Sequence, residues 1–100
     1  RVLVDNSASD TYTVIEVNGR DRPGLLHDLT RALFAAGLTI HSAQVATYGE
    51  RAVDVFYVKD GFGLKITHAQ RLDDIRQKMR EALGDGTVRV PRRKRAAPAR

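Results

Sequence analysis

Apolar and polar residues alternate along four short segments of the chain, and this two-residue period predicts β-strands. The break in alternation near His41–Ser42 predicts a β-bulge, and Gly49 is expected to form the turn of a hairpin between the last two strands. The last strand is apolar on both faces, which is typical of a strand that is covered on both sides. The segments are residues 1–6, 12–17, 38–48 and 51–59.

Two other segments show the 3.6-residue period of amphipathic helices. In the first, the apolar stripe is predicted to run through Leu26, Leu29 and Leu33, widened by Leu25 and Phe34, and the helix is expected to end at Gly37. The second helix is predicted to begin with a capping box over residues 67–70 and to end at Gly84. Its stripe comprises Leu72, Ile75, Met79 and Leu83.

The order of these elements predicts an α+β fold. Strand, helix, strand, strand, helix is the ferredoxin-like βαββαβ motif without its final strand. Residues 1–6 or 87–90 could supply the missing edge strand, and we favour 1–6 because proline at position 91 leaves the other segment very short. We therefore expect an antiparallel four-stranded sheet with two helices on one face, formed by residues 1–86. The second face, expected to carry Val14, Phe56 and Val58, would then need a partner.

The positive charge of the chain is concentrated at one end. The net charge is +5, but six of the 17 basic residues lie in residues 87–100, which contain no acid. We interpret this segment as a disordered basic tail. It has no interleaved aromatic residues, so it is a weak indication of nucleic-acid binding. The chain has no cysteine and no apolar run long enough to cross a membrane, which fits a cytoplasmic protein.

The residues offer little support for catalysis. His27, His41 and His68 have no metal-ligand spacing, and the glycines near position 20 lack the ending of a phosphate-binding loop. Asp54 stands alone in an apolar strand, and we expect it to be a hydrogen-bonded, partly buried acid rather than a general base. We expect no catalytic residue and no metal.

The sequence NGRDRPGLL, residues 18–26, joins a strand to a helix and is the best candidate for a ligand site. Pro23 suits the first turn of the helix, and Asp21 could accept hydrogen bonds from its unpaired amides. Gly24 would be costly in a first turn, so either a neighbouring strand or a ligand is expected close to it. The amides suit a carboxylate and Asp21 suits an ammonium, and an amino acid carries both groups. A capped helix without a ligand is the alternative.

Residues 14–60, which include this D-R-P-G-L-L corner, resemble an ACT domain, a small module that binds amino acids in metabolic regulators. Residues 41–67 and 2–17 more specifically resemble the last ACT domain of the bifunctional enzymes that uridylylate and de-uridylylate the PII signalling protein. By position, the resemblance implies an effector site that includes residues of a neighbouring module. The implied site residues are Gly19, Asp21, Arg22, Gly24 and Leu25, with Thr39 and Ile40 from the neighbour. ACT domains often have asparagine where Asp21 stands.

This resemblance implies a cytoplasmic nitrogen sensor. Glutamine would be the effector, another ACT domain and PII would be the protein partners, and the catalytic domains of the parent enzyme would use Mg²⁺, with no cofactor in this segment. Three alternatives remain: a purely structural dimerisation module, an ACT domain of another amino-acid-regulated enzyme, and a nucleic-acid-binding module acting through the tail.

Overall fold

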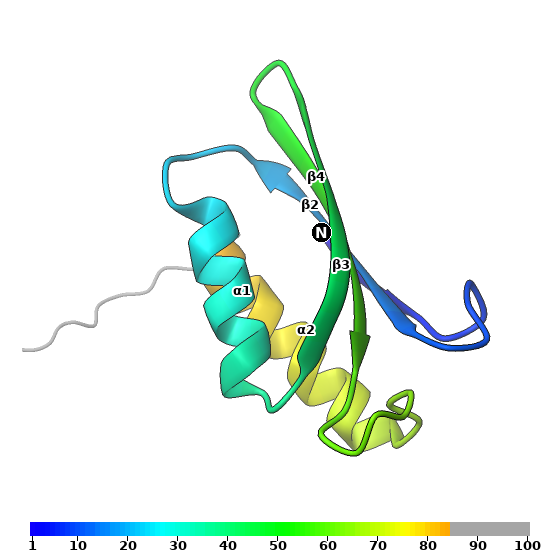
Figure 1. Cartoon of the computed structure of the whole chain (residues 1–100). Coiled ribbons are helices and arrows are strands. Elements are labelled where there is room, and N and C mark those ends of the chain that lie inside the picture. The colour runs from blue at the N-terminus through cyan, green and yellow to red at the C-terminus, as the bar shows by residue number, and fades with distance from the viewer. Residues whose placement is uncertain (85–100) are drawn as a thin grey trace, which may run out of the picture.

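The structure, a computed structural model, describes residues 1–84 and has two layers, a sheet and a pair of helices. The sheet is antiparallel with strand order β1-β2-β4-β3, and α1 and α2 lie together on one of its faces (Figure 1). This confirms the predicted α+β architecture. The elements are β1 (Val2–Asp5), β2 (Thr13–Arg20), α1 (Leu25–Ala35), β3 (Thr39–Tyr48), β4 (Arg51–Lys59) and α2 (Ala69–Leu83).

The edge beside β2 is occupied by β1, as predicted. The two strands pair antiparallel, with Val2 opposite Val17 and Asp5 opposite Val14. The alternative edge strand at 87–90, and the basic tail, lie outside the described residues. At the other edge, β3 pairs with β4 alone among the described strands, and a register shift between Ile40 and Ser42 confirms the predicted bulge.

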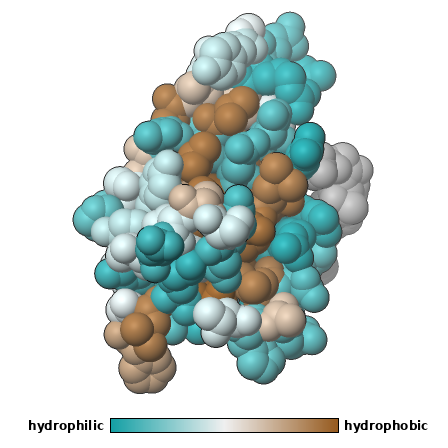
Figure 2. Space-filling view, turned by 90° about the vertical axis from the view of Figure 1, so that its right-hand side faces the viewer, coloured by the Kyte–Doolittle hydropathy of each residue, from teal (hydrophilic) through white to brown (hydrophobic). Residues whose placement is uncertain are grey.

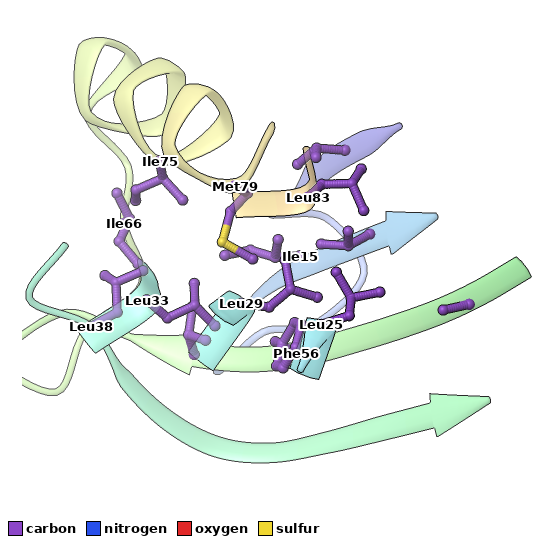
Figure 3. Close-up of a cluster of buried hydrophobic side chains, with 14 residues drawn as sticks. Ile15, Leu25, Leu29, Leu33, Leu38, Phe56, Ile66, Ile75, Met79 and Leu83 are labelled. Atoms are coloured by element: carbon purple, nitrogen blue, oxygen red, sulfur yellow. The ribbon is translucent and has the colours of Figure 1, made fainter. Parts of the chain in front are cut away.

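One core fills the space between the sheet and the helices. Figure 3 shows side chains of α1 and α2 pointing toward Ile15 and Phe56 of the sheet, both of which are completely buried. Burying each such side chain contributes about 1.5–3 kcal/mol. The helical members of this core are Leu25, Leu29, Leu33, Ile75, Met79 and Leu83.

The predicted stripe of α1 is partly wrong. The buried residues recur every four positions, at Leu25, Leu29 and Leu33, whereas Leu26 is 42% exposed and Phe34 is 66% exposed. The helix therefore turns toward the sheet the row of residues that are spaced four apart. The sequence places leucines in both rows, and only the position of the helix on the sheet selects between them.

The two faces of the sheet also differ from the prediction. Phe56 and Val58 face the helices and are fully buried, so they are not part of a second apolar face. Val14 lies on the open face, as predicted, and on β4 the apolar residues of that face are Val53 and Val55, which lie opposite Asn18 and Glu16. Figure 2 views this face and shows a band of apolar surface crossing it between polar side chains.

The ends of the helices follow different rules. After α1, the Gly37 amide donates to Phe34 O and the Leu38 amide to Leu33 O, with Gly37 at φ 80°. These two bonds form a Schellman motif, so Gly37 ends the helix as predicted. Gly84 ends α2 in the left-handed region. The predicted capping box is wrong, because His68 is the N-cap of α2 and no side chain caps it.

The rotation of α1 gives a matched test. Leu29→Ala should lower the free energy of unfolding by about 2–5 kcal/mol because it opens a cavity in the core. Leu26→Ala, the same change three residues earlier, should alter it by only about 0.5 kcal/mol. Urea denaturation of both variants checks this. Equal losses would contradict the observed orientation of α1.

Candidate functional site

The corner between β2 and α1 is held to the hairpin that joins β3 to β4. The Asp21 amide donates to the Glu50 carbonyl at 2.8 Å, and Arg20 forms an exposed ion pair with Glu50 at 3.3 Å. The corner, the hairpin turn and the start of α1 therefore share one end of the molecule, at the top of Figure 1.

Gly24 is the N-cap of α1, and its conformation explains why it is glycine. It has φ 80° and ψ 1°, in the left-handed region that other L-residues adopt at a cost of roughly 1–2 kcal/mol. A Cβ atom built at Gly24 would have no neighbour within 4 Å in the part of the chain that the structure describes. The expected contact from a neighbouring strand is therefore absent, and the space beside Gly24 is open.

Asp21 does not cap the helix. Among residues 1–84, no side-chain hydrogen bond caps the start of α1, and Asp21 is exposed. The Leu25 amide is not available to a ligand either, because it donates to the Arg22 carbonyl at 3.2 Å. Within residues 1–84, the amides of Leu26 and His27 have no such partner. The amides of Arg22 and Gly24 also have no such partner in this part of the chain, so Leu25 is the one predicted donor that is paired there, and the unpaired donors extend to His27.

The Arg22 side chain is engaged within the fold. Its guanidinium lies 2.9 Å from an Asp28 carboxylate oxygen and donates to the Ala82 carbonyl at 2.7 Å. These contacts join the corner to both helices. Arg22 therefore holds the start of α1 against the end of α2, and its charge is already paired.

Two other predicted site residues have structural roles. A Cβ atom at Gly19 would lie 2.6 Å from Leu83 Cδ1, so α2 packs where a larger side chain would stand. Leu25 is buried in the core. Both residues shape the corner, but neither side chain presents a polar group to a ligand.

Thr39 and Ile40 lie at the far end of the domain from the corner. They begin β3, whereas the corner lies beside the end of β3 and the start of β4. There they line a surface pocket of ≈ 390 Å³ together with Tyr12, His41 and Lys59. Tyr12 stacks on His41 with ring centroids 4.6 Å apart. Within one domain these residues cannot contact a ligand at the corner.

Asp54 is a possible functional residue that sequence reasoning missed, because the sequence did not predict how its side chain is buried. It is only 2% exposed, and its Oδ1 atom is buried without a hydrogen-bond partner among residues 1–84. The expectation of a partly buried, hydrogen-bonded acid is therefore wrong. Burial raises the pKa of Asp54 above the ordinary carboxyl value of 3.8, and the nearby negative charge of Asp21 raises it further.

Taken together, the corner offers complementary charges to a small zwitterion. Two amides and the positive end of the α1 dipole can hold an anionic group, while the Asp21 carboxylate can hold a cationic one. Within residues 1–84 there is no cluster of three or more potential metal ligands. No helix in that part of the chain is long and apolar enough to cross a membrane.

The open space at Gly24 predicts that its conformation, not its size, limits substitution. Gly24→Ala should lower the free energy of unfolding by roughly 1–2 kcal/mol because alanine is strained at φ 80°. Gly24→Asn should cost less, since asparagine adopts this region more readily. Thermal and urea denaturation of the two variants check the order. Equal stability of Gly24→Ala and the unmodified protein would contradict it.

The raised pKa of Asp54 predicts a fall in stability with rising pH. Above pH 3.8 the folded protein retains a proton that the unfolded chain loses, so the free energy of unfolding decreases as pH rises through the folded pKa. Asp54→Asn should remove this decrease. Urea denaturation of both proteins at a series of pH values above 3.8 checks this. The same pH profile in Asp54→Asn and the unmodified protein would contradict the raised pKa of Asp54.

Asp5 and Asp60 provide the contrast within the same experiment. Hydrogen bonds from Ser7 lower the pKa of Asp5, and the Leu64 amide lowers that of Asp60. Their stabilising contributions are present above pH 3.8 and are lost as pH falls through the lowered values. Their effect therefore has the opposite sign and a lower pH range, and it should survive in the Asp54→Asn variant.

Comparison with known proteins agrees with this fold. Residues 13–83 match the family model described as ACT domain. A crystal structure of an unknown protein from Galdieria sulphuraria aligns with a TM-score of 0.56 and 26% identity, over 70% of this chain and 37% of that one.

The curated relatives are much longer proteins. A bifunctional uridylyltransferase/uridylyl-removing enzyme from Azospirillum brasilense is 66% identical over 85 residues, which is 85% of this chain and 9% of that enzyme. The enzyme of the same name from Gluconobacter oxydans is 58% identical over 91 residues, or 91% of this chain and 10% of that enzyme. The chain thus spans about a tenth of each relative. By the family match and the fold that agrees with it, this chain belongs to the ACT domain family.

Proposed function

We propose that this ACT domain binds free glutamine at the corner between β2 and α1. We further propose that it regulates a bifunctional uridylyltransferase/uridylyl-removing enzyme acting on PII. The observation that carries the first proposal is the juxtaposition of unpaired first-turn amides with the exposed Asp21 carboxylate. The high identity to one segment of the uridylyltransferase enzymes supports the second.

In this proposal the ligand binds by its two charges. Its carboxylate accepts hydrogen bonds from the amides of Leu26 and His27, where the helix dipole also favours an anion. Its ammonium lies beside Asp21. The open space at Gly24 lets the ligand reach the backbone without meeting a side chain. Arg22 does not compete for the carboxylate, because it is paired with Asp28.

A second ACT domain completes the site. Within the described sheet, β3 is an edge strand of 10 residues, and an unpaired edge of this length favours pairing with another strand. Val45 and Tyr48 on β3 and Phe34 on α1 are exposed apolar or aromatic residues that such pairing could cover. We expect the partner to be a second copy or a sister domain in the same enzyme.

Antiparallel pairing of two β3 strands would explain how Thr39 and Ile40, at the far end of the domain, could belong to the ligand site. In that arrangement the start of the partner's β3 lies beside the end of this one. Thr39 and Ile40 of one domain then approach the corner of the other, although the two sites are separated within a single domain. Glutamine bound there contacts both modules and favours their paired arrangement.

Differential binding provides the regulation. A ligand shifts an equilibrium only by the difference between its affinities for the two states. Glutamine that binds the paired modules more tightly than the separated ones would favour one arrangement of the catalytic domains. We propose that this arrangement turns uridylyl transfer off and uridylyl removal on.

Calorimetry of the 100-residue chain against glutamine, glutamate and other amino acids tests the proposal. We expect saturable binding of glutamine and weaker binding of the others, together with a larger mass by light scattering when glutamine is present. No binding to any amino acid, together with a dimer mass that is the same with and without amino acids, would instead identify a structural dimerisation module. Salt-sensitive binding of nucleic acid that requires residues 91–100 would favour the tail alternative.

Asp21→Asn separates ligand binding from helix capping. Because Asp21 makes no capping hydrogen bond, the substitution should change the free energy of unfolding very little. It removes a charge-assisted hydrogen bond to the ammonium, worth roughly 1.5–3 kcal/mol, so glutamine should bind about ten- to a hundredfold more weakly. Unchanged affinity in calorimetry would exclude Asp21 from the site.

A further inference from the structure

We propose that Asp54 is a second binding carboxylate of this site and contacts the ammonium group of the amino-acid ligand from the sheet below. The inference rests on the proposed function, since it requires an amino acid at the corner. It gives the Asp54 carboxyl group, which has no hydrogen-bond partner among the described residues, a partner in the ligand.

The register of the sheet places Asp54 beneath the start of α1. Asp54 faces the helices between Ala52 and Phe56, which are two residues away on either side of it. Both neighbours belong to the core cluster that contains Leu25, the first residue of α1. Figure 3 shows Leu25 and Phe56 close together at this end of the core. Asp54 is also near enough to Asp21 for the two charges to interact.

The fold itself gives no reason for an acid at this position. A buried polar atom without a hydrogen bond is destabilising, and an unpaired charge more so. The groups opposite Asp54 in the sheet are Val17 and Val45, which offer it no polar side chain. Arg22, the cation of the corner, is bound to Asp28 and Ala82 instead. Within residues 1–84 no cation therefore pairs with Asp54, and its carboxyl group is available to a cationic group of a ligand.

The β3 side of the site is the route by which such a cation could arrive. Val45 lies next to Asp54 on the helix-facing side of the sheet, yet it is 53% exposed. Hence α1 does not cover β3 at the level of Val45. A ligand that enters between the start of α1 and β3 would meet Asp21 at the surface and Asp54 below it, and its ammonium could donate hydrogen bonds to both side chains.

Asp54→Asn tests this role, with Glu16→Gln as the matched control. Glu16 is also a strand carboxylate, but it is next to Val17 in sequence and so lies on the opposite face of the sheet. Calorimetry should show about ten- to a hundredfold weaker glutamine binding in Asp54→Asn and no change in Glu16→Gln. The variant should be at least as stable as the unmodified protein, because it removes an unpartnered buried carboxyl.

A ligand analogue separates contact from a general structural effect. Glutaramic acid, which is glutamine without its ammonium, should bind the unmodified protein and Asp54→Asn equally weakly in competition calorimetry. An equal loss for glutamine and glutaramic acid would mean that Asp54 only shapes the site, and would overturn the proposal. Glutamine binding unchanged by Asp54→Asn would overturn it and leave the proposed function standing.

Two further outcomes are also decisive. If the unmodified protein binds no amino acid, both the proposed function and this inference fail.

If Asp54→Asn does not fold, a crystal structure of the unmodified protein with glutamine decides. We expect the ligand nitrogen within about 2.6–3.2 Å of an Asp54 carboxylate oxygen. An ammonium bound elsewhere, or a lysine or arginine of a second copy at Asp54, would refute the inference.

Discussion

The packing of α1 on the sheet is the constraint on which the corner depends. Leu25, Leu29 and Leu33 fix which side of the helix faces Ile15 and Phe56. This orientation sets the direction of the first-turn amides and leaves Leu26 on the surface. Gly24 then has to join the strand to a helix whose position is already determined, and a left-handed conformation achieves that connection. The geometry of the candidate site is therefore a consequence of core packing.

Much of the fold could be predicted because its signals are local. Alternation of apolar residues identified the strands, and Gly37 and Gly84 marked the ends of the helices. The bulge after Ile40 was visible as a break in the alternation. The edge strand could be chosen because only one of two candidate segments was long enough, and β1 confirms it.

The errors concern features that depend on contacts distant in sequence. Leucines occur in two neighbouring rows of α1, and the helical period alone does not say which row is buried. Gly24 looked like a first-turn residue because Pro23 is a good one, but the helix begins later and the glycine serves as its N-cap. The burial of Asp54 depends on the helices above it, so a lone acid in a strand gave no sign of being unpartnered.

The hydrogen bond from the Asp21 amide to the Glu50 carbonyl has a mechanical consequence. It ties the loop that would hold a ligand to the tip of the long hairpin, and β3 leaves that tip along the outer edge of the sheet. Together with the Arg20–Glu50 ion pair and the pairing of Arg20 with Arg51, it connects the loop to the hairpin directly, without passing through the core. A shift of the loop on ligand binding would therefore move the tip of the hairpin, and with it the β3 edge against which a neighbouring module would pack.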